Sequence, residues 1–203
     1  LPSGRVFKLV DSRPNSYLYH ESDLGQFFLN SDAITHSYRT AKRIAHIIKL
    51  VPADVVDALF DYGSTIGAYT IFPGNRVDNK MTINGERGCS SRILDRFDIT
   101  LECIRRYYNN LDSPLSAVLK RYSDFFALFG DFQGYVDFFF FQDLVSWDYS
   151  RVRFHIPYEC FEAYPLPKSK EEYCRYQEST VNFIQSRAKR MKASLQRHCA
   201  GCT

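Results

Sequence analysis

The sequence has little of what would assign it to a membrane or to a familiar enzyme class. Its strongest apolar run, Phe138–Phe141, is four residues, far short of the roughly 18 that a membrane span needs. It contains neither G-x-x-x-x-G-K-S/T nor G-x-G-x-x-G, which excludes the P-loop and the dinucleotide fingerprint. No signal peptide opens the chain, which begins at Leu1. We therefore expect a cytoplasmic protein that does not interact with a membrane.

Charge and cysteine spacing carry little information as well. The formal net charge of +3 at pH 7 permits an anionic partner without requiring one. Six cysteines are scattered along a chain long enough to bury its own core, so free thiols fit better than a disulfide framework. The pair Cys199 and Cys202 lacks the second pair that zinc would need. We predict no metal site, and the sequence identifies no cofactor.

Aromatic residues are abundant, and they dominate the predicted core. The chain holds 17 Phe and 14 Tyr, which predicts a core filled with rings. Apolar residues at helical spacing predict helices over residues 37–51, 52–60, 93–108, 116–129 and 135–145, and a long one from Ser169. The segment 135–145 is apolar nearly all round, as a central buried helix should be.

The fold predicted from these patterns is mainly α (α+β). We expect a single domain over residues 1–203, a helical bundle around the buried aromatic helix with a small β-hairpin element. Turn residues dominate positions 1–35, which we interpret as an irregular segment with one or two short strands. A helical core follows over residues 36–198. Within it we predict a β element at about 68–83, in which strand 68–72 pairs with 81–83.

The stretch Phe72–Gly88 is the sequence's main candidate for a binding site. In this polar loop and just beyond it, cations and amides alternate with glycines that let the backbone approach a ligand. Arginine matches phosphate with two parallel hydrogen bonds. The predicted ligand-binding residues are Asn75, Arg76, Lys80, Asn84, Arg87 and Arg92. The alternative is that the glycines only form turns and the arginines are solvated.

We predict that this loop binds a phosphate-bearing ligand, a nucleotide or a nucleic acid, with hydrolytic or transfer chemistry as an option. On that hypothesis Arg76→Ala and Arg87→Ala would abolish binding without lowering the melting temperature. Asp95 and Asp98 are the carboxylates nearest the cations in sequence, which makes them the candidate catalytic bases. Together with Glu102 they follow helical spacing and are able to hold a metal. The alternative is that Glu102 pairs with Arg105 or Arg106.

Two basic surfaces support a different function, a non-enzymatic module that binds nucleic acid or an acidic partner. One is the polar face of the predicted helix at 37–51, between positions 39 and 49. The other is the tail of the last helix, where no acidic residue follows Glu178 and cations accumulate. A homodimer formed through aromatic surface is a third possibility.

Three motifs resemble an uncharacterised bacterial protein family. They are FPGNR at 72–76, KMTINGERG at 80–88 and DRFDITLECIRR at 95–106. The similarity would span about residues 60–190. It implies a bacterial, cytoplasmic protein with one intact domain. It implies no activity, because the family has no established one and supplies no catalytic residues.

Overall fold

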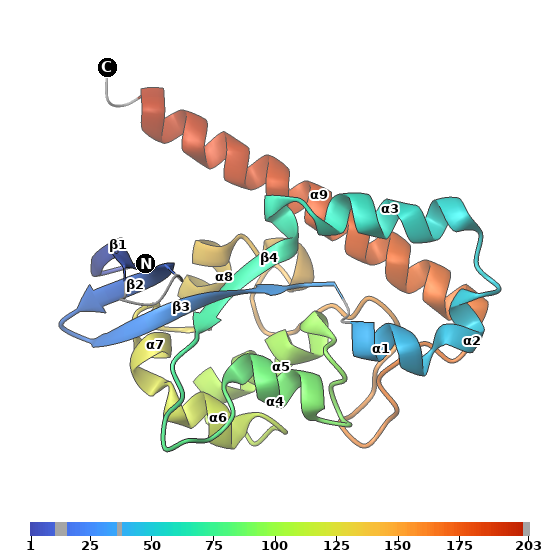
Figure 1. Cartoon of the computed structure of the whole chain (residues 1–203), viewed down its shortest axis with the longest axis horizontal. Coiled ribbons are helices and arrows are strands. Elements are labelled where there is room, and N and C mark those ends of the chain that lie inside the picture. Colours follow the sequence, from blue (N-terminus) through green and yellow to red (C-terminus); the bar gives the residue numbers. More distant parts are fainter. Residues whose placement is uncertain (11–15, 36–37, 201–203) are drawn as a thin grey trace.

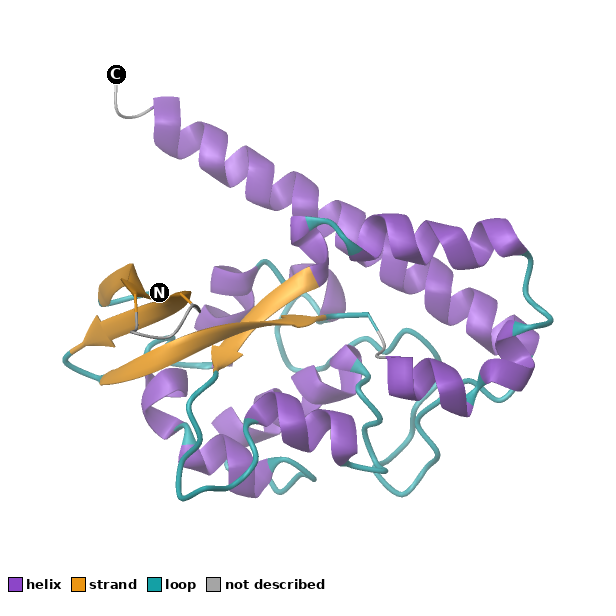
Figure 2. Cartoon of the chain, in the orientation of Figure 1, coloured by secondary structure: helices purple, strands orange, loops and turns teal. Residues whose placement is uncertain are grey.

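The chain folds into a four-stranded antiparallel sheet with helices packed against it (Figures 1 and 2). A computed structural model describes residues 1–10, 16–35 and 38–200. Helices make up 50% of the chain, so the fold is mixed α+β. The predicted helical bundle is not what the structure contains, because a sheet rather than a helix forms one side of the core.

The sheet is a meander whose order follows the sequence. Its strands are β1 (Gly4–Val10), β2 (Ser16–Ser22), β3 (Gly25–Ala33) and β4 (Tyr69–Pro73). Ser22 pairs with Gly25 across a tight turn, and β4 joins the free edge of β3. The prediction of an irregular segment over residues 1–35 is therefore wrong. Phe27 and Leu29, two residues apart on β3, both face the core.

The predicted hairpin is also wrong in its second strand. The strand predicted at 68–72 exists as β4, but its partner is β3. Residues 81–83 instead lead into α4 (Ile83–Cys89), and Thr82 caps that helix by accepting a hydrogen bond from the Gly85 N–H at 3.4 Å. A threonine before a helical turn is a common helix start. Here it begins the helix into which the polar loop leads.

Several predicted helices are present; the one predicted over 52–60 ends slightly later than expected, and the others are shorter or divided. They are α1 (Tyr38–Arg43), α2 (Ala45–Ile48), α3 (Ala53–Gly63), α5 (Phe97–Tyr108), α6 (Ser116–Arg121) and α7 (Ser123–Ala127). A break at Tyr122 divides the helix predicted over 116–129. The one predicted over 93–108 starts only at Phe97, because Leu94 and Asp95 have φ of 44° and 67° and cannot continue a right-handed helix.

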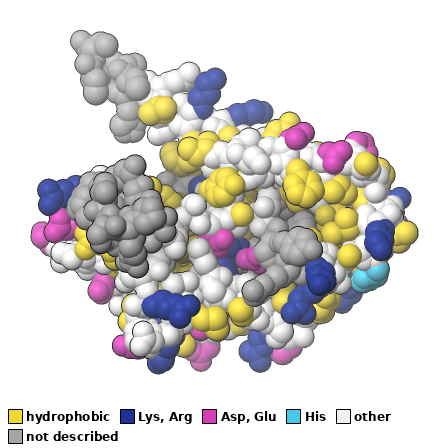
Figure 3. Space-filling view, in the orientation of Figure 1, with side chains coloured by type: hydrophobic (Ala, Val, Ile, Leu, Met, Phe, Trp, Pro, Cys, Tyr) yellow, Lys and Arg dark blue, Asp and Glu magenta, His cyan; other side chains and the backbone are white. Residues whose placement is uncertain are grey.

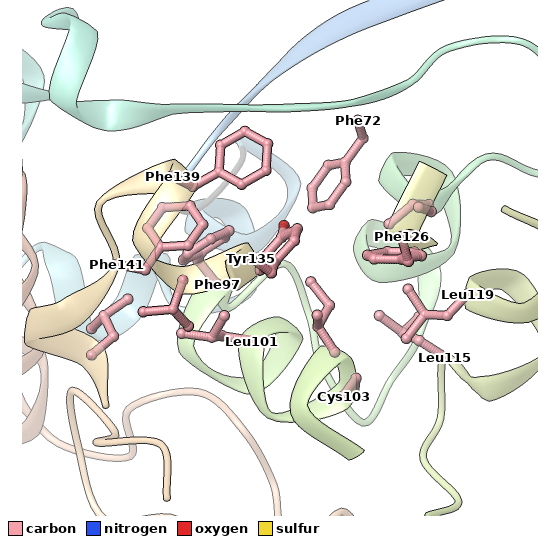
Figure 4. Close-up of a cluster of buried hydrophobic side chains, with 14 of the residues drawn as sticks. Phe72, Phe97, Leu101, Cys103, Leu115, Leu119, Phe126, Tyr135, Phe139 and Phe141 are labelled. Carbon is pink, nitrogen blue, oxygen red and sulfur yellow. The ribbon is translucent and has the colours of Figure 1, made fainter. Parts of the chain in front are cut away.

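The core is a layer of aromatic rings between the sheet and the helices (Figure 4). At its centre is α8 (Phe132–Phe139), which presents Tyr135 and Phe139 to Phe141 in the chain that follows. This helix is shorter than predicted because Phe140 adopts φ 59°, after which the chain continues into η2 (Gln142–Leu144). Trp147 follows in a surface turn and is 90% exposed.

The longest element is α9 (Lys170–Ala200), which crosses the molecule beside α3 and projects past the body at its C-terminal end (Figure 1). Its start near Ser169 confirms the sequence prediction. Arg187 fixes its crossing point, where the guanidinium donates to the carbonyls of Phe139, Gly67 and Tyr69 at 2.6–2.8 Å. Gly67 belongs to η1 (Ile66–Ala68). The side chain of Cys199, and Cys202, lie outside the described residues.

Candidate functional site

The polar loop leads from β4 into α4 and presents its cations separately. Arg76 and Lys80 are exposed, whereas Asn75 and Asn84 are half-buried. The loop is tied to the body through Asn75, whose carbonyl accepts a hydrogen bond from the Tyr122 hydroxyl at 2.8 Å. The side-chain oxygens of Asn75 and Asn84 are buried without a hydrogen-bond partner among the described residues.

Arg87 points into the protein. It is fully buried, and its guanidinium donates to Asp32, to the Thr100 hydroxyl at 3.2 Å and to the Asp95 carbonyl at 2.9 Å. These partners come from the end of β3, from α5 and from the turn before α5. Arg87 therefore joins three elements, and in this position it does not reach a ligand in solvent.

The two predicted catalytic carboxylates are also turned inward. Asp95 lies in the turn before α5, with its carboxylate 3.3 Å from Arg87. Asp98 is fully buried in the first turn of α5, where it receives two hydrogen bonds from Arg96 and one from the His155 backbone N–H at 2.9 Å. Burial is the largest influence and would raise the pKa of Asp98, but the charge of Arg96, the interaction with His155 and the hydrogen bonds from both residues together hold that pKa below its usual range.

Glu102 confirms the structural alternative to a metal site. Its carboxylate accepts two hydrogen bonds from Arg105 at 2.8 Å and one from Arg106 at 3.0 Å. Since Asp98 is bonded to Arg96, the three carboxylates do not converge on one point. Within residues 1–10, 16–35 and 38–200 there is no group of three or more His, Cys, Asp or Glu side chains able to hold a metal ion.

Four arginines line a single cleft, which we call the arginine cleft. It has a volume of about 500 Å³ and lies between the second half of α5 and the segment 151–162. Its arginines are Arg92, Arg105, Arg106 and Arg151; its aromatic side chains are Phe154, Tyr158 and Phe161; its acids are Glu102, Asp112, Glu159 and Glu162. Of the residues predicted to bind a ligand, Arg92 is the one that lines this cleft.

The four guanidinium groups differ in how they are held. Arg105 and Arg106 share Glu102, and Arg106 also donates to the Asp112 carbonyl at 2.9 Å. Arg92 and Arg151 are exposed, and neither side chain makes a hydrogen bond or an ion pair with a described residue. The cleft therefore combines two fixed cations with two that are available to a ligand.

The other wall of the arginine cleft is aromatic. Ring centroids lie 5.0 Å apart for Phe154 and Tyr158, and 6.0 Å apart for Tyr158 and Phe161. The Tyr158 hydroxyl is buried with no hydrogen-bond partner among the described residues, and burial raises its pKa. Phe161 lies under the Arg106 guanidinium, 5.1 Å from it. A planar group entering the cleft would meet ring faces as well as cations.

Sequence reasoning missed most of this cleft. Residues 152–156 alternate in sequence as a short strand would, but among the described residues they form only an isolated bridge, between Val145 and Val152. The useful signal was the composition of residues 151–162, which mixes arginine, aromatics and acids around Pro157. None of the helices in the described part of the chain is long and apolar enough to cross a membrane.

Comparison with known proteins gives a family without an assigned activity. The profile of a family described as "Family of unknown function (DUF6994)" matches residues 1–191. No curated protein and no solved structure matches the chain.

Proposed function

The chain belongs to this family of unknown function, and from its own geometry we propose that it binds a phosphate-bearing ligand of the nucleotide type in the arginine cleft. The observation that carries the proposal is the pair Arg92 and Arg151, two exposed guanidinium groups that share the cleft with the Glu102-bound pair. A planar guanidinium binds phosphate oxygens through two hydrogen bonds at once. Arg105 and Arg106 add positive charge whose position is already fixed.

The aromatic wall and the acids favour a nucleotide over inorganic phosphate. Phe154 and Tyr158 offer faces on which a base can stack. Glu159 and Glu162 are carboxylates at the same cleft and are able to accept hydrogen bonds from ribose hydroxyls or base amino groups. A small inorganic anion would use the arginines alone and would face these carboxylates unfavourably.

The experiment is a thermal-shift and calorimetric titration with AMP, GMP and inorganic phosphate. We expect a nucleotide to raise the melting temperature by mass action. Arg92→Ala and Arg151→Ala should each weaken binding roughly tenfold or more, the effect of losing a hydrogen bond to a charged group. Arg76→Ala is the matched control, because Arg76 is an exposed arginine of the polar loop that does not line the cleft.

Two outcomes would contradict the proposal in different ways. Loss of binding in Arg76→Ala, with Arg92→Ala and Arg151→Ala unaffected, would return the site to the polar loop. Equal affinity for AMP and inorganic phosphate would remove the nucleotide from the proposal, since the rings and carboxylates would then contribute nothing.

A second candidate function uses the projecting end of α9. Lys189, Lys192 and Arg197 are exposed there, and this end of the helix extends past the body (Figure 1). If these cations hold a nucleic acid, the binding constant should fall with salt. For duplex DNA its logarithm falls by roughly 0.9 per neutralised phosphate for each tenfold rise in salt concentration. On the face in Figure 3, by contrast, lysines and arginines are dispersed. Fluorescence anisotropy of a short oligonucleotide, titrated at two salt concentrations, separates this function from nucleotide binding.

A further inference from the structure

A second cleft lies on the other side of the 151–155 segment, and it contains a serine–histidine pair. It has a volume of about 570 Å³, and Arg153 and His155 face residues of α9 across it. We call it the dyad cleft. It shares Phe154 with the arginine cleft but none of that cleft's arginines.

The two members of the pair are in hydrogen-bond contact. The His155 Nδ1 and the Ser179 Oγ are 2.9 Å apart. Ser179 is half-buried on α9, whereas the His155 side chain is buried. When the imidazole carries its proton on Nε2, the Ser179 hydroxyl donates to Nδ1, which is the arrangement of a nucleophile and its general base.

The backbone of His155 is anchored to the core, and its ring packs against Tyr176. The backbone N–H of His155 donates to Asp98 at 2.9 Å, and Asp98 is itself bonded to Arg96 inside the core. The Tyr176 ring meets the imidazole edge-on, with centroids 5.5 Å apart and planes at 88°. Asp98 thus acts through His155 as a positioning residue, and the sequence-predicted catalytic carboxylate lies next to the pair without touching the cleft.

The imidazole of His155 is in the neutral state that a general base needs. Burial lowers its pKa, Asp98 acts in the opposite direction, and Arg96 lowers it further. The imidazole is therefore neutral at pH 7 and able to accept a proton. The imidazolium formed on proton transfer would have the Asp98 carboxylate as its nearest compensating charge.

The cleft also offers cations for a developing negative charge. Arg153 and Arg175 line it and are exposed, and within the described residues neither side chain forms a hydrogen bond or an ion pair. Arginine stabilises the oxygens of a phosphoryl group during transfer. A nucleophile, a held base and two cations occupy one cleft, which is the combination that a reactive serine requires.

We propose that Ser179 is a nucleophile toward phosphoryl groups, activated by His155 in the dyad cleft. Ser179 Oγ forms a bond to phosphorus while the bond from phosphorus to the leaving oxygen breaks. The hydroxyl proton passes to His155 Nδ1 and from there to the leaving oxygen. Water then attacks the phosphorus of the phosphoserine. His155 takes a proton from the water and returns it to Ser179 Oγ as the Oγ–P bond breaks, which releases phosphate and restores the free hydroxyl.

The test is covalent labelling of the full chain with an alkyl fluorophosphonate, mapped by peptide mass spectrometry. In this reaction the Oγ–P bond forms, fluoride leaves and the proton passes to the imidazole. We expect an adduct on Ser179 that disappears in Ser179→Ala. Ser186→Ala is the matched control, because Ser186 lines the same cleft on the same helix but has no histidine partner. His155→Gln should slow labelling about 100-fold.

A merely structural hydrogen bond gives a different result. If the His155→Gln variant does not fold, the role of His155 is tested instead by measuring the labelling rate of the wild type as a function of pH. That rate should fall as the pH drops below the pKa of His155, which lies under the ordinary value of 6.5. Three results would overturn the proposal: no adduct on Ser179, equal labelling of Ser179 and Ser186, or a labelling rate that does not change with pH in this range. None of these outcomes bears on nucleotide binding in the arginine cleft.

Discussion

Among the described residues, three arginines have their guanidinium groups fully inside the protein. Arg87, Arg96 and Arg187 are among the largest fully buried side chains, and each is held by backbone carbonyls or carboxylates. Composition alone cannot distinguish an inward arginine from a solvated one, which is why Arg87 was predicted as a ligand-binding residue. Spacing held a clue, since Ile83 and Arg87 are four apart on one short helix and share its buried face.

Replacing Arg87 tests this interpretation directly. Arg87→Ala removes the cation beside Asp32 and the donor to the Asp95 carbonyl, so we expect a loss of about 3 kcal/mol in the free energy of unfolding. The measurement is urea unfolding followed by circular dichroism. Arg76→Ala, at an exposed position of the same loop, should change stability by under about 0.5 kcal/mol. Equal stability of both variants would show that Arg87 is not structural.

The buried imidazole of His155 predicts a loss of stability in mild acid. Its pKa in the folded state lies below the unfolded value of 6.5, so the unfolded chain binds more protons as the pH falls through 6.5. This contribution is present above pH 6.5 and decreases below it, by at most about 1.4 kcal/mol per pH unit, until the folded pKa is reached.

Unfolding of the wild type and of His155→Gln at pH 7 and pH 5 measures this effect. The variant should lose less stability between the two pH values than the wild type does. His20, whose pKa is also lowered by burial, contributes equally to both proteins and cancels. His46→Gln, at an exposed position, should retain the wild-type pH dependence. A pH dependence unchanged in His155→Gln would contradict the assignment.

At the scale of elements, helices were easier to predict than strands. The period of α9 appears in the sequence because this helix buries one face where it crosses the body, at Tyr173, Tyr176, Phe183 and Ile184. The apolar stripe of α5 was also visible in the sequence, although all of residues 97–104 are buried. The first three strands were predicted only as one or two short strands in an irregular segment, because their signal is weak: Phe27, Phe28 and Leu29 are consecutive apolar residues, which hides the alternation of β3. The pairing of β3 with β4 joins distant parts of the chain, which no local pattern records.

The crossing of η1 and α9 depends on a glycine. A Cβ on Gly67 would lie 2.4 Å from the Ile184 carbonyl oxygen and 3.1 Å from the Ala188 Cβ. Gly67→Ala should therefore destabilise the protein by about 1–3 kcal/mol, because backbone has to move. Gly63→Ala is the control, since its Cβ would meet only Thr35 at 3.5 Å. Thermal unfolding of both variants checks this, and similar melting temperatures would contradict the close crossing.

At the scale of the whole molecule, one hydrophobic cluster links the sheet to α5, α6, α7, α8 and α9. The aromatic content predicted a ring-filled core, and the rings in Figure 4 agree. The shape of that core could not be predicted from the sequence. Rings that pack against a sheet and rings that pack against a helix have the same composition. The arginine cleft was missed for the same reason, since α5 and the 151–162 segment meet only after the core has formed.

The large hydrophobic cluster contains Cys103, which predicts that this buried thiol reports global unfolding. Cys103 is buried, and burial raises its pKa to about 12, whereas Cys160 is exposed. In pulsed alkylation followed by mass spectrometry, Cys160 should react directly and Cys103 only through the unfolded state. In the Gly67→Ala variant, the labelling rate of Cys103 should rise by the same factor as the equilibrium constant for unfolding. Equal rates for the two thiols would mean that the core opens locally.

The exposed indole of Trp147 determines how such measurements are read. It is the chain's single tryptophan, and at 90% exposure it is surrounded by water already in the native state. Unfolding hardly changes its surroundings, so its emission spectrum should barely shift during a melt. A thermal-unfolding assay that follows tryptophan emission would therefore show almost no transition for this protein. The same indole, lying outside the rigid interior, is a natural donor for energy-transfer measurements with a dye on Cys160.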